Sequence, residues 1–378
     1  MAFLRNDAVN RVNLHSGIQA LAQASGGIFF LVFMLRADVS IPAALMAQSA
    51  ILAGRLVLRP AILPLAKRWG LKPMLIAGTI VVALQYPLLA KVDGAGGWLL
   101  VLCTTAAIGE ILYWPTYNAY FATVGDAEHR GHQVSAREAI VSVVGIIAPL
   151  LGAWALVTLG PHPMFAAVGL VQALAAVPLI GAPNVGVKAT APGAFRAARL
   201  GTMLYATDGW FDACFIFIWQ IALFVALGEN VSAYGGAMAL AALVGAAFGL
   251  LLGRHIDAGH GRRAVTIAYS LAAILVLLRA GSLEAPWLAV TANALGGLLW
   301  PLMLPTLVAA TYNLAKASPC PLRFSIVAEA GWDLGCVGAC LVAAALAAAG
   351  APLSIAILMA LPAVAIAAHL LRRYFANG

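Results

Sequence analysis

The sequence predicts an all-α membrane protein with twelve transmembrane helices in two six-helix bundles, and three observations lead to this fold class. Charged residues make up only 10% of the 378 residues, whereas soluble globular proteins carry roughly 25%. A soluble enzyme and a disordered protein are therefore excluded. Apolar runs long enough to cross a bilayer recur along the whole chain, and a weak internal repeat crosses its middle.

The apolar runs define the individual spans. A bilayer core about 30 Å thick requires roughly 20 apolar residues per helix, and glycine or proline marks many of the breaks between the runs. A transmembrane β-barrel would show alternating apolar and polar residues, which runs such as LVAAALAAAG do not. The predicted spans are 14–36, 41–65, 73–91, 97–123, 134–159, 163–183, 200–227, 231–253, 264–283, 286–313, 323–349 and 352–372.

The basic residues predict the orientation of these spans. With both termini in the cytoplasm, Arg36, Lys91 and Arg279 fall on the outer side and Arg55 lies within the second span. The remaining eighteen of the 22 lysines and arginines fall on the inner side, as the positive-inside rule requires. We therefore expect both termini to be cytoplasmic. The same rule accounts for the net charge of +8, so no nucleic-acid partner is expected.

An internal repeat suggests that the two halves arose by duplication. Trp114-Pro115-Thr116 recurs as Leu304-Pro305-Thr306, and matching basic loops and helix starts lie at a similar offset. Parallel repeats of six helices with a substrate site between them are a known transporter design. The predicted organisation is an N-terminal bundle over 1–183, a cytoplasmic linker over 184–199 and a C-terminal bundle over 200–378.

The most specific motif lies between the eighth and ninth spans. Gly253 is followed by three residues and Asp257, and Gly261 is followed by Arg262 and Arg263. This pattern resembles the cytoplasmic loop motif of the major facilitator superfamily, with one extra residue between Asp257 and Gly261. The corresponding first-half loop departs from the pattern, because Lys67 stands where the acid would be.

The resemblance extends over essentially the whole chain, through the twelve spans, the two halves and the central linker. It implies two bundles related by pseudo-two-fold symmetry and alternating access around a central cavity. It also implies that Gly253, Asp257, Gly261, Arg262 and Arg263 form a conformational latch.

A second motif bears on the direction of transport. The segment 145–153, GIIAPLLGA, is similar to part of the family's antiporter motif, with alanine at two places. The alternative is ordinary packing through small residues, which membrane helices favour. An arginine early in the fourth span, found in exporters of this family, is missing, which disfavours drug–proton antiport by an arginine relay.

Acidic residues inside apolar spans are the strongest candidates for a functional site, because a charge there is costly. Asp208 and Asp212 share a helix face by their four-residue spacing, as do Glu329 and Asp333. Two carboxylates on one face can share a proton. The expected residues for proton coupling and substrate binding are Glu110, Asp208, Asp212 and Asp333. The alternative is that the acids pair with Arg55, Arg59 or Arg137, and we expect structural ion pairs for Glu138 and Glu329.

Aromatic and amide side chains are frequent in the first, fourth, seventh and tenth spans. These spans line the central cavity in the superfamily that the sequence resembles. Aromatic walls with a few acids suit an amphiphilic or cationic organic solute, although membrane-protein aromatics also anchor helices at the lipid interface. The expected cavity residues are Gln19, Gln23, Tyr113, Trp114, Tyr117, Asn118, Trp210, Gln220, Asn293 and Trp300.

These observations predict a secondary active transporter that moves a small organic solute by alternating access, coupled to protons, with export favoured. We expect a monomer in the bacterial cytoplasmic membrane, no enzymatic activity, no metal site and no cofactor; the chain lacks the phosphate-binding motif of ATPases. One alternative is an uptake permease for a nutrient or metal chelate. Another is a non-transporting membrane assembly factor or membrane enzyme on the same helical scaffold.

Overall fold

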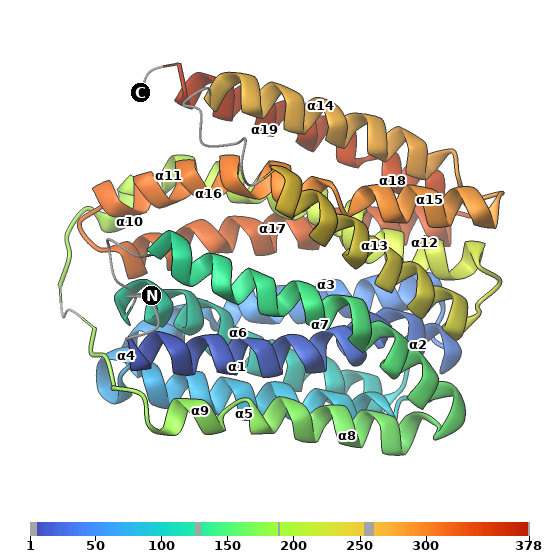
Figure 1. The fold of residues 1–378 in the computed structure, drawn as a ribbon, viewed down its shortest axis with the longest axis horizontal. Helices are drawn as coiled ribbons and strands as arrows, with labels where there is room; N and C mark the ends of the chain where they lie inside the picture. The colour runs from blue at the N-terminus through green and yellow to red at the C-terminus, as the bar shows by residue number, and fades with distance from the viewer. Residues whose placement is uncertain (1–5, 125–129, 188–189, 253–260, 377–378) are drawn as a thin grey trace. The chain divides into compact units, whose positions relative to one another are not determined.

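A computed structural model describes residues 6–124, 130–187, 190–252 and 261–376, and every regular element in these ranges is helical (Figure 1). Within these ranges, twelve helical stretches are long and apolar enough to cross a membrane, which confirms the predicted number of spans. Their bounds are Asp7–Arg36, Ile41–Trp69, Leu71–Leu89, Gly97–Phe121, Ala139–Thr158, Pro161–Ile180, Arg199–Ala226, Val231–Gly249, Gly261–Ala280, Pro286–Ala317, Leu322–Ala348 and Leu353–Tyr374.

Several spans consist of more than one helix because glycine or proline interrupts them. Gly26 ends α1, and Pro60 lies in the 3₁₀ turn between α3 and α4. The helices of the first half are α1 (Asp7–Ser25), α2 (Phe30–Arg36), α3 (Ile41–Leu58), α4 (Ile62–Trp69), α5 (Leu71–Leu89), α6 (Gly97–Val124), α7 (Arg130–Thr158), α8 (Pro161–Leu174) and α9 (Val177–Ile180). Those that follow are α10 (Ala194–Ala197), α11 (Arg199–Asp212), α12 (Trp219–Ala226), α13 (Val231–Leu252), α14 (Gly261–Ala280), α15 (Pro286–Gly296), α16 (Leu299–Ala317), α17 (Pro321–Ala348), α18 (Leu353–Leu358) and α19 (Ala360–Tyr374).

The chain forms two compact units. Unit 1 contains residues 1–38 and 54–191, and unit 2 contains residues 39–53 and 192–378. Residues 39–53, which the sequence places in the N-terminal bundle, thus belong to unit 2. Within unit 1, α1 packs against α7 and α8, while α5 packs against α6 and α8. Within unit 2, α11 packs against α17 and α19, and α14 packs against α16 and α19.

The helices of unit 1 approach each other closely at glycine residues, which have no side chain to hold the backbones apart. A Cβ atom at Gly78 would lie 2.7 Å from the backbone nitrogen of Tyr113, so α5 and α6 meet there. A Cβ atom at Gly152 would collide with the carbonyl of Ser25, so α7 meets α1 at this position. Gly152 belongs to the segment that is similar to an antiporter motif, and helix packing accounts for its small size.

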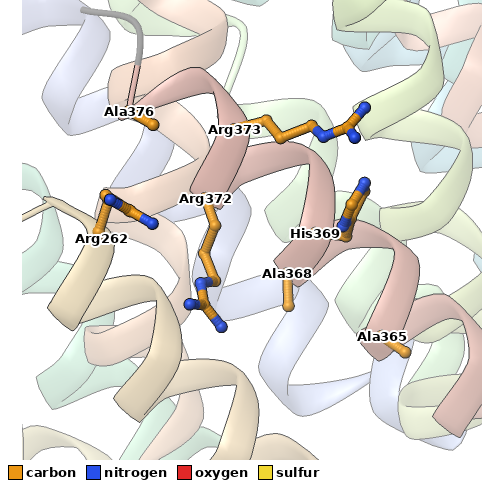
Figure 2. A pocket seen from close by; sticks show the side chains of 7 residues that line it. All are labelled: Arg262, Ala365, Ala368, His369, Arg372, Arg373 and Ala376. Carbon is orange, nitrogen blue, oxygen red and sulfur yellow. The ribbon is translucent and has the colours of Figure 1, made fainter.

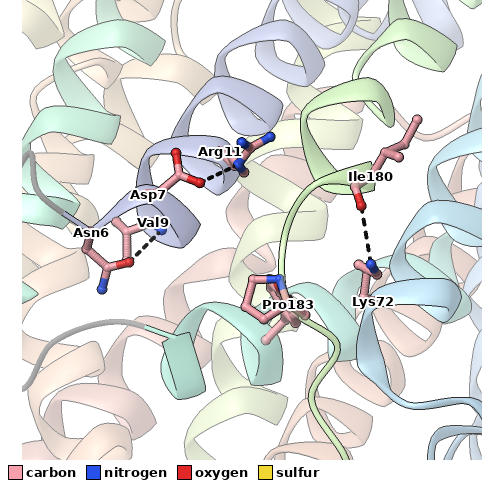
Figure 3. A network of polar contacts seen from close by, with 8 residues as sticks. Asn6, Asp7, Val9, Arg11, Lys72, Ile180 and Pro183 are labelled. Atoms are coloured by element: carbon pink, nitrogen blue, oxygen red, sulfur yellow. Dashed lines mark hydrogen bonds and ion pairs between the residues drawn. The ribbon is translucent and has the colours of Figure 1, made fainter.

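The segment after α9 is fixed to the turn between α4 and α5 by polar contacts. The side chain of Asn184 accepts a hydrogen bond from the backbone of Lys72 (3.2 Å) and donates one to the carbonyl of Trp69 (3.0 Å). The ammonium group of Lys72 also donates to the carbonyl of Ile180 (3.3 Å), as Figure 3 shows. The beginning of the expected linker is therefore part of unit 1.

Glycines also bring α11 and α17 together in unit 2. Cβ atoms at Gly209, Gly331 and Gly335 would each collide with a backbone carbonyl of the facing helix. The thiol of Cys336 donates to the carbonyl of Gly209 at 2.9 Å. Small residues permit such backbone contact between membrane helices. The acids of α11 consequently lie beside α17.

The seventh span changes its helical type directly after Asp212. Residues Ala213–Ile218 form a π-helical turn, η4, before the α-helical pattern resumes at Trp219 in α12. Such turns are rare and occur often at functional sites. This turn separates the acidic part of the span from its second half.

Candidate functional site

Asp208 and Asp212 line one small cavity in unit 2. The four-residue spacing that the sequence shows places them one helical turn apart, and the structure places both at this cavity. The other walls are mostly aromatic or aliphatic and come from the seventh span, α14 and α16. The full lining is Asp208, Phe211, Asp212, Phe215, Tyr269, Leu299, Trp300, Met303 and Leu307.

Asp212 is held in place by a residue of α17. The indole nitrogen of Trp332 donates a hydrogen bond of 2.9 Å to Oδ2 of Asp212, whose side chain is buried. Within the described ranges, no lysine or arginine forms an ion pair with Asp208 or Asp212. A carboxylate in apolar surroundings is costly without a counter-charge. The cavity is therefore suited to hold a proton shared between the two carboxyl groups, or a cationic ligand.

The cavity is small in this conformation. Its volume is about 30 Å³, enough for only a few water molecules, each of which needs about 10–15 Å³. Phe211 and Phe215 stack with ring centroids 4.9 Å apart along one wall. An organic solute would enter only after these aromatic side chains, or the helices that carry them, have moved.

The other acids expected to be functional have different surroundings. Glu110 lies in unit 1, where its carboxylate forms an ion pair of 2.8 Å with the guanidinium of Arg55. This is one of the pairings that the sequence left open as an alternative. Asp333 is fully buried in α17 but does not line the cavity of Asp208 and Asp212.

Unit 1 contains a buried polar cluster built around His15 of α1. Nδ1 of His15 lies 2.7 Å from the carbonyl of Ala175, and Nε2 lies 3.0 Å from the hydroxyl of Tyr113. A carbonyl only accepts hydrogen bonds, so Nδ1 carries the proton. In the neutral ring, Nε2 then accepts from Tyr113. The ring thus joins α1 to α6 and to the end of α8.

A second chain of hydrogen bonds runs beside this histidine. Arg137 donates to the hydroxyl of Tyr117 at 3.2 Å, and that hydroxyl lies 2.8 Å from Oγ of Ser16. Ser16 itself donates to the carbonyl of Val12 at 2.9 Å. Because Ser16 has a single proton, Tyr117 is the donor of the hydroxyl pair. The rings of Tyr113 and Tyr117 stack with centroids 5.7 Å apart.

The remaining residues expected at the cavity are placed in several ways. In unit 1, Trp114 packs edge-on against Tyr113, Gln19 donates to Gln23, and Asn118 is exposed. In unit 2, Trp210 donates to the carbonyl of Met359 rather than lining the acidic cavity, and Gln220 is half-buried. Trp300 lines that cavity.

Asn293 belongs to a separate buried network. It accepts a hydrogen bond from Trp219 at 2.9 Å and donates one to the carbonyl of Ala237 at 2.8 Å. Arg279 lies 3.5 Å above the ring of Phe215 and 4.5 Å above that of Trp219. Its guanidinium donates to the carbonyl of Phe215 in the π-helical turn. This network fixes the second half of the seventh span against α13, α14 and α15.

The expected latch is described only in part. Gly253 and Asp257 lie outside the described residues, while Gly261, Arg262 and Arg263 form the first turn of α14. A Cβ atom at Gly261 would lie 2.6 Å from the ring of Phe375, so glycine lets α14 meet the end of α19.

Several residues of these clusters were not predicted as site residues, among them Tyr269, Trp332, Arg137 and His15. Tyr269 lines the acidic cavity, and Trp332 donates a hydrogen bond to Asp212. Both are distant in sequence from Asp212, and no local sequence pattern connects them to it. Arg137 was considered only as a partner for an acid. His15 did carry a signal, because it is an ionisable side chain within an apolar span.

Comparisons with known proteins are consistent with this architecture. Residues 16–202 match the sequence model of the Major Facilitator Superfamily. An auto inhibited POT family peptide transporter is 13% identical, with a TM-score of 0.67 over 98% of this chain and 97% of that one. The human organic anion transporter MFSD10 (TETRAN) is 15% identical, with a TM-score of 0.69 over 97% of this chain and 99% of that one. No curated protein sequence gives a significant match.

Proposed function

Because the chain belongs to the major facilitator superfamily and is a membrane transporter of that fold, we propose that it couples the movement of a small organic cation to protons. The observation that carries this proposal is the cavity of Asp208 and Asp212. Two acids one turn apart face aromatic walls, and no described lysine or arginine is paired with either. Either a proton or a cationic solute would supply the missing positive charge.

The walls of the cavity favour an organic cation over an inorganic one. Aromatic faces attract ammonium groups through cation–π interactions, and Phe211, Tyr269 and Trp300 provide such faces. Competition between the solute and the proton for the same carboxylates would couple their movements, because each would leave when the other binds. The small volume of the cavity fits a proton-loaded state that opens before the solute enters.

Amide variants test this coupling. Asp208→Asn and Asp212→Asn keep the side-chain volume and mimic the protonated acid. In liposomes with an imposed pH gradient, both should lose gradient-driven transport of ethidium and of smaller amines. At least one should keep solute exchange at equal pH. The matched control is Asp93→Asn, which changes an exposed acid in the loop between α5 and α6.

Two results would contradict the proposal. If both amide variants still transport up a pH gradient, these carboxylates are structural and coupling lies elsewhere. If the wild-type protein transports fluorescein or another organic anion and no amine, the assignment of a cationic solute is wrong.

For direction we propose export, which rests on the similarity of segment 145–153 to an antiporter motif. The packing of Gly152 against α1 gives the same residues a structural role, so a direct measurement is needed. Liposomes with opposite pH gradients should accumulate the amine only on the acidic side if the protein is a proton antiporter. Accumulation on the alkaline side would instead support an uptake symporter.

A further inference from the structure

A basic groove lies at the C-terminal end of α19, in unit 2. Figure 2 shows Arg262 on α14 beside Arg372 and Arg373 at the end of α19, with Ala368 and Ala365 farther along the same helix. The cavity has a volume of about 430 Å³, and its described lining contains no acidic residue. It is lined by Arg262, Ala365, Ala368, His369, Arg372, Arg373 and Ala376.

The shape of the groove follows from the sequence of α19. Ala365, Ala368, Arg372 and Ala376 recur at helical spacing and therefore share one face. The alanine side chains leave a shallow floor where larger residues would fill the space. Gly261 allows the first turn of α14 to pack against Phe375, and this contact holds Arg262 beside the end of α19.

The charges of the groove select an anion. Arg262, Arg372 and Arg373 are all exposed, and guanidinium groups bind phosphate oxygens in a bidentate manner. The volume of the groove, about 430 Å³, is more than ten times that of the acidic cavity, about 30 Å³. It is therefore large enough for a phosphate group with further atoms attached.

The floor of the groove selects a ligand that also has an apolar part. α19 belongs to the last candidate span, Leu353–Tyr374, and its exposed face continues to Ile366, which is 51% exposed. Basic pockets at the cytoplasmic ends of transmembrane helices bind anionic lipid headgroups. The predicted topology places this end of α19 at the cytoplasmic leaflet.

We propose that this groove binds one anionic phospholipid. Arg262 and Arg372 hold its phosphate, and one acyl chain lies over Ala368 and Ala365 towards the bilayer core. A soluble phosphate would use the arginines alone and would gain nothing from the alanine floor. The site is distinct from the acidic cavity, so the proposal does not depend on the transported solute.

Native mass spectrometry of the purified full-length protein tests the site. Phosphatidylglycerol and phosphatidylcholine with identical acyl chains are offered together, and we expect one phosphatidylglycerol to be retained in preference. The double variant Arg262→Gln/Arg372→Gln should retain at least tenfold less of it. Ala368→Leu keeps every charge but fills the floor, and it should also reduce retention. The matched control is Arg196→Gln/Arg199→Gln, which removes two exposed arginines elsewhere in unit 2.

Three outcomes would overturn the proposal. No preference for phosphatidylglycerol in the wild-type protein would show that the groove is not a lipid site. Equal losses in the two double variants would show a general attraction between basic residues and anionic lipid. Displacement of the lipid by millimolar glycerol 3-phosphate, together with normal retention by Ala368→Leu, would show a site for soluble phosphate compounds.

Discussion

Replacing Glu110 with glutamine removes the negative charge that faces Arg55 in unit 1, and we expect this change to destabilise the protein. The two side chains are 2.8 Å apart, and they are 24% and 7% exposed, respectively. Removing one partner of a buried ion pair costs about 3–5 kcal/mol. Because the carboxylate is partly exposed and therefore screened, we expect a loss of about 2–3 kcal/mol in the free energy of unfolding.

A double variant separates the structural role of Glu110 from a role in coupling. Arg55→Gln/Glu110→Gln replaces the ion pair with two neutral amides, which can still form a hydrogen bond. We expect it to recover at least half of the stability that Glu110→Gln loses. Unfolding in mixed dodecyl maltoside and dodecyl sulfate micelles, followed by circular dichroism, measures both differences.

Transport by the double variant completes the test. If Glu110 serves to neutralise Arg55, the double variant transports with the pH gradient at close to the wild-type rate. The reasoning is refuted if the double variant is no more stable than Glu110→Gln. Recovered stability with lost gradient-driven transport would instead assign a proton-carrying role to Glu110.

Four further predictions concern packing, the acidic site, topology and the latch. Gly335→Ala places a Cβ atom 2.7 Å from the backbone nitrogen of Trp210 and should cost about 1–3 kcal/mol of stability. Gly236→Ala, which has open space around it, should be neutral or stabilising in the same unfolding assay. Trp332→Phe removes the hydrogen bond to Asp212 and should lower stability by about 1–3 kcal/mol and slow gradient-driven transport in liposomes. Reporter fusions after Gly378 and after Asp93 should read cytoplasmic and external, respectively, and an external C-terminus would exclude the predicted topology. Asp257→Asn should reduce the initial transport rate without lowering the melting temperature. An unchanged rate in folded protein would contradict the predicted role of Asp257 in a conformational latch.

Local sequence patterns predicted the features that depend on neighbouring residues. The number of spans follows from the length of apolar runs, and the structure confirms it. Asp208 and Asp212 face one cavity because residues four apart share a helix face. These features require no knowledge of which helices pack together.

Contacts between distant helices were not predictable in the same way. Trp332 reaches Asp212 because glycines let α11 and α17 approach, and this approach depends on the packing of the whole unit. Trp210 was predicted to line the cavity, yet its indole donates to the carbonyl of Met359, whereas Trp332 was not predicted and donates to Asp212. Which face of a helix looks toward which neighbour is a property of the three-dimensional packing, so aromatic composition alone did not separate these two tryptophans.

The π-helical turn between Asp212 and Trp219 holds one extra residue while the two halves of the span keep the directions in which they face. Each residue of an α-helix advances by about 100°, so an inserted residue would normally rotate everything that follows it. A π-helical turn absorbs such a residue locally. Deleting one residue within Ala213–Ile218 should therefore convert this turn to α-helix and leave Trp219 facing Asn293 and the two acids facing their cavity. A deletion within the regular helix α11 should instead rotate the two parts of the span against each other by about 100°. The π-helical turn is thus a position at which the span can gain or lose one residue without losing either site.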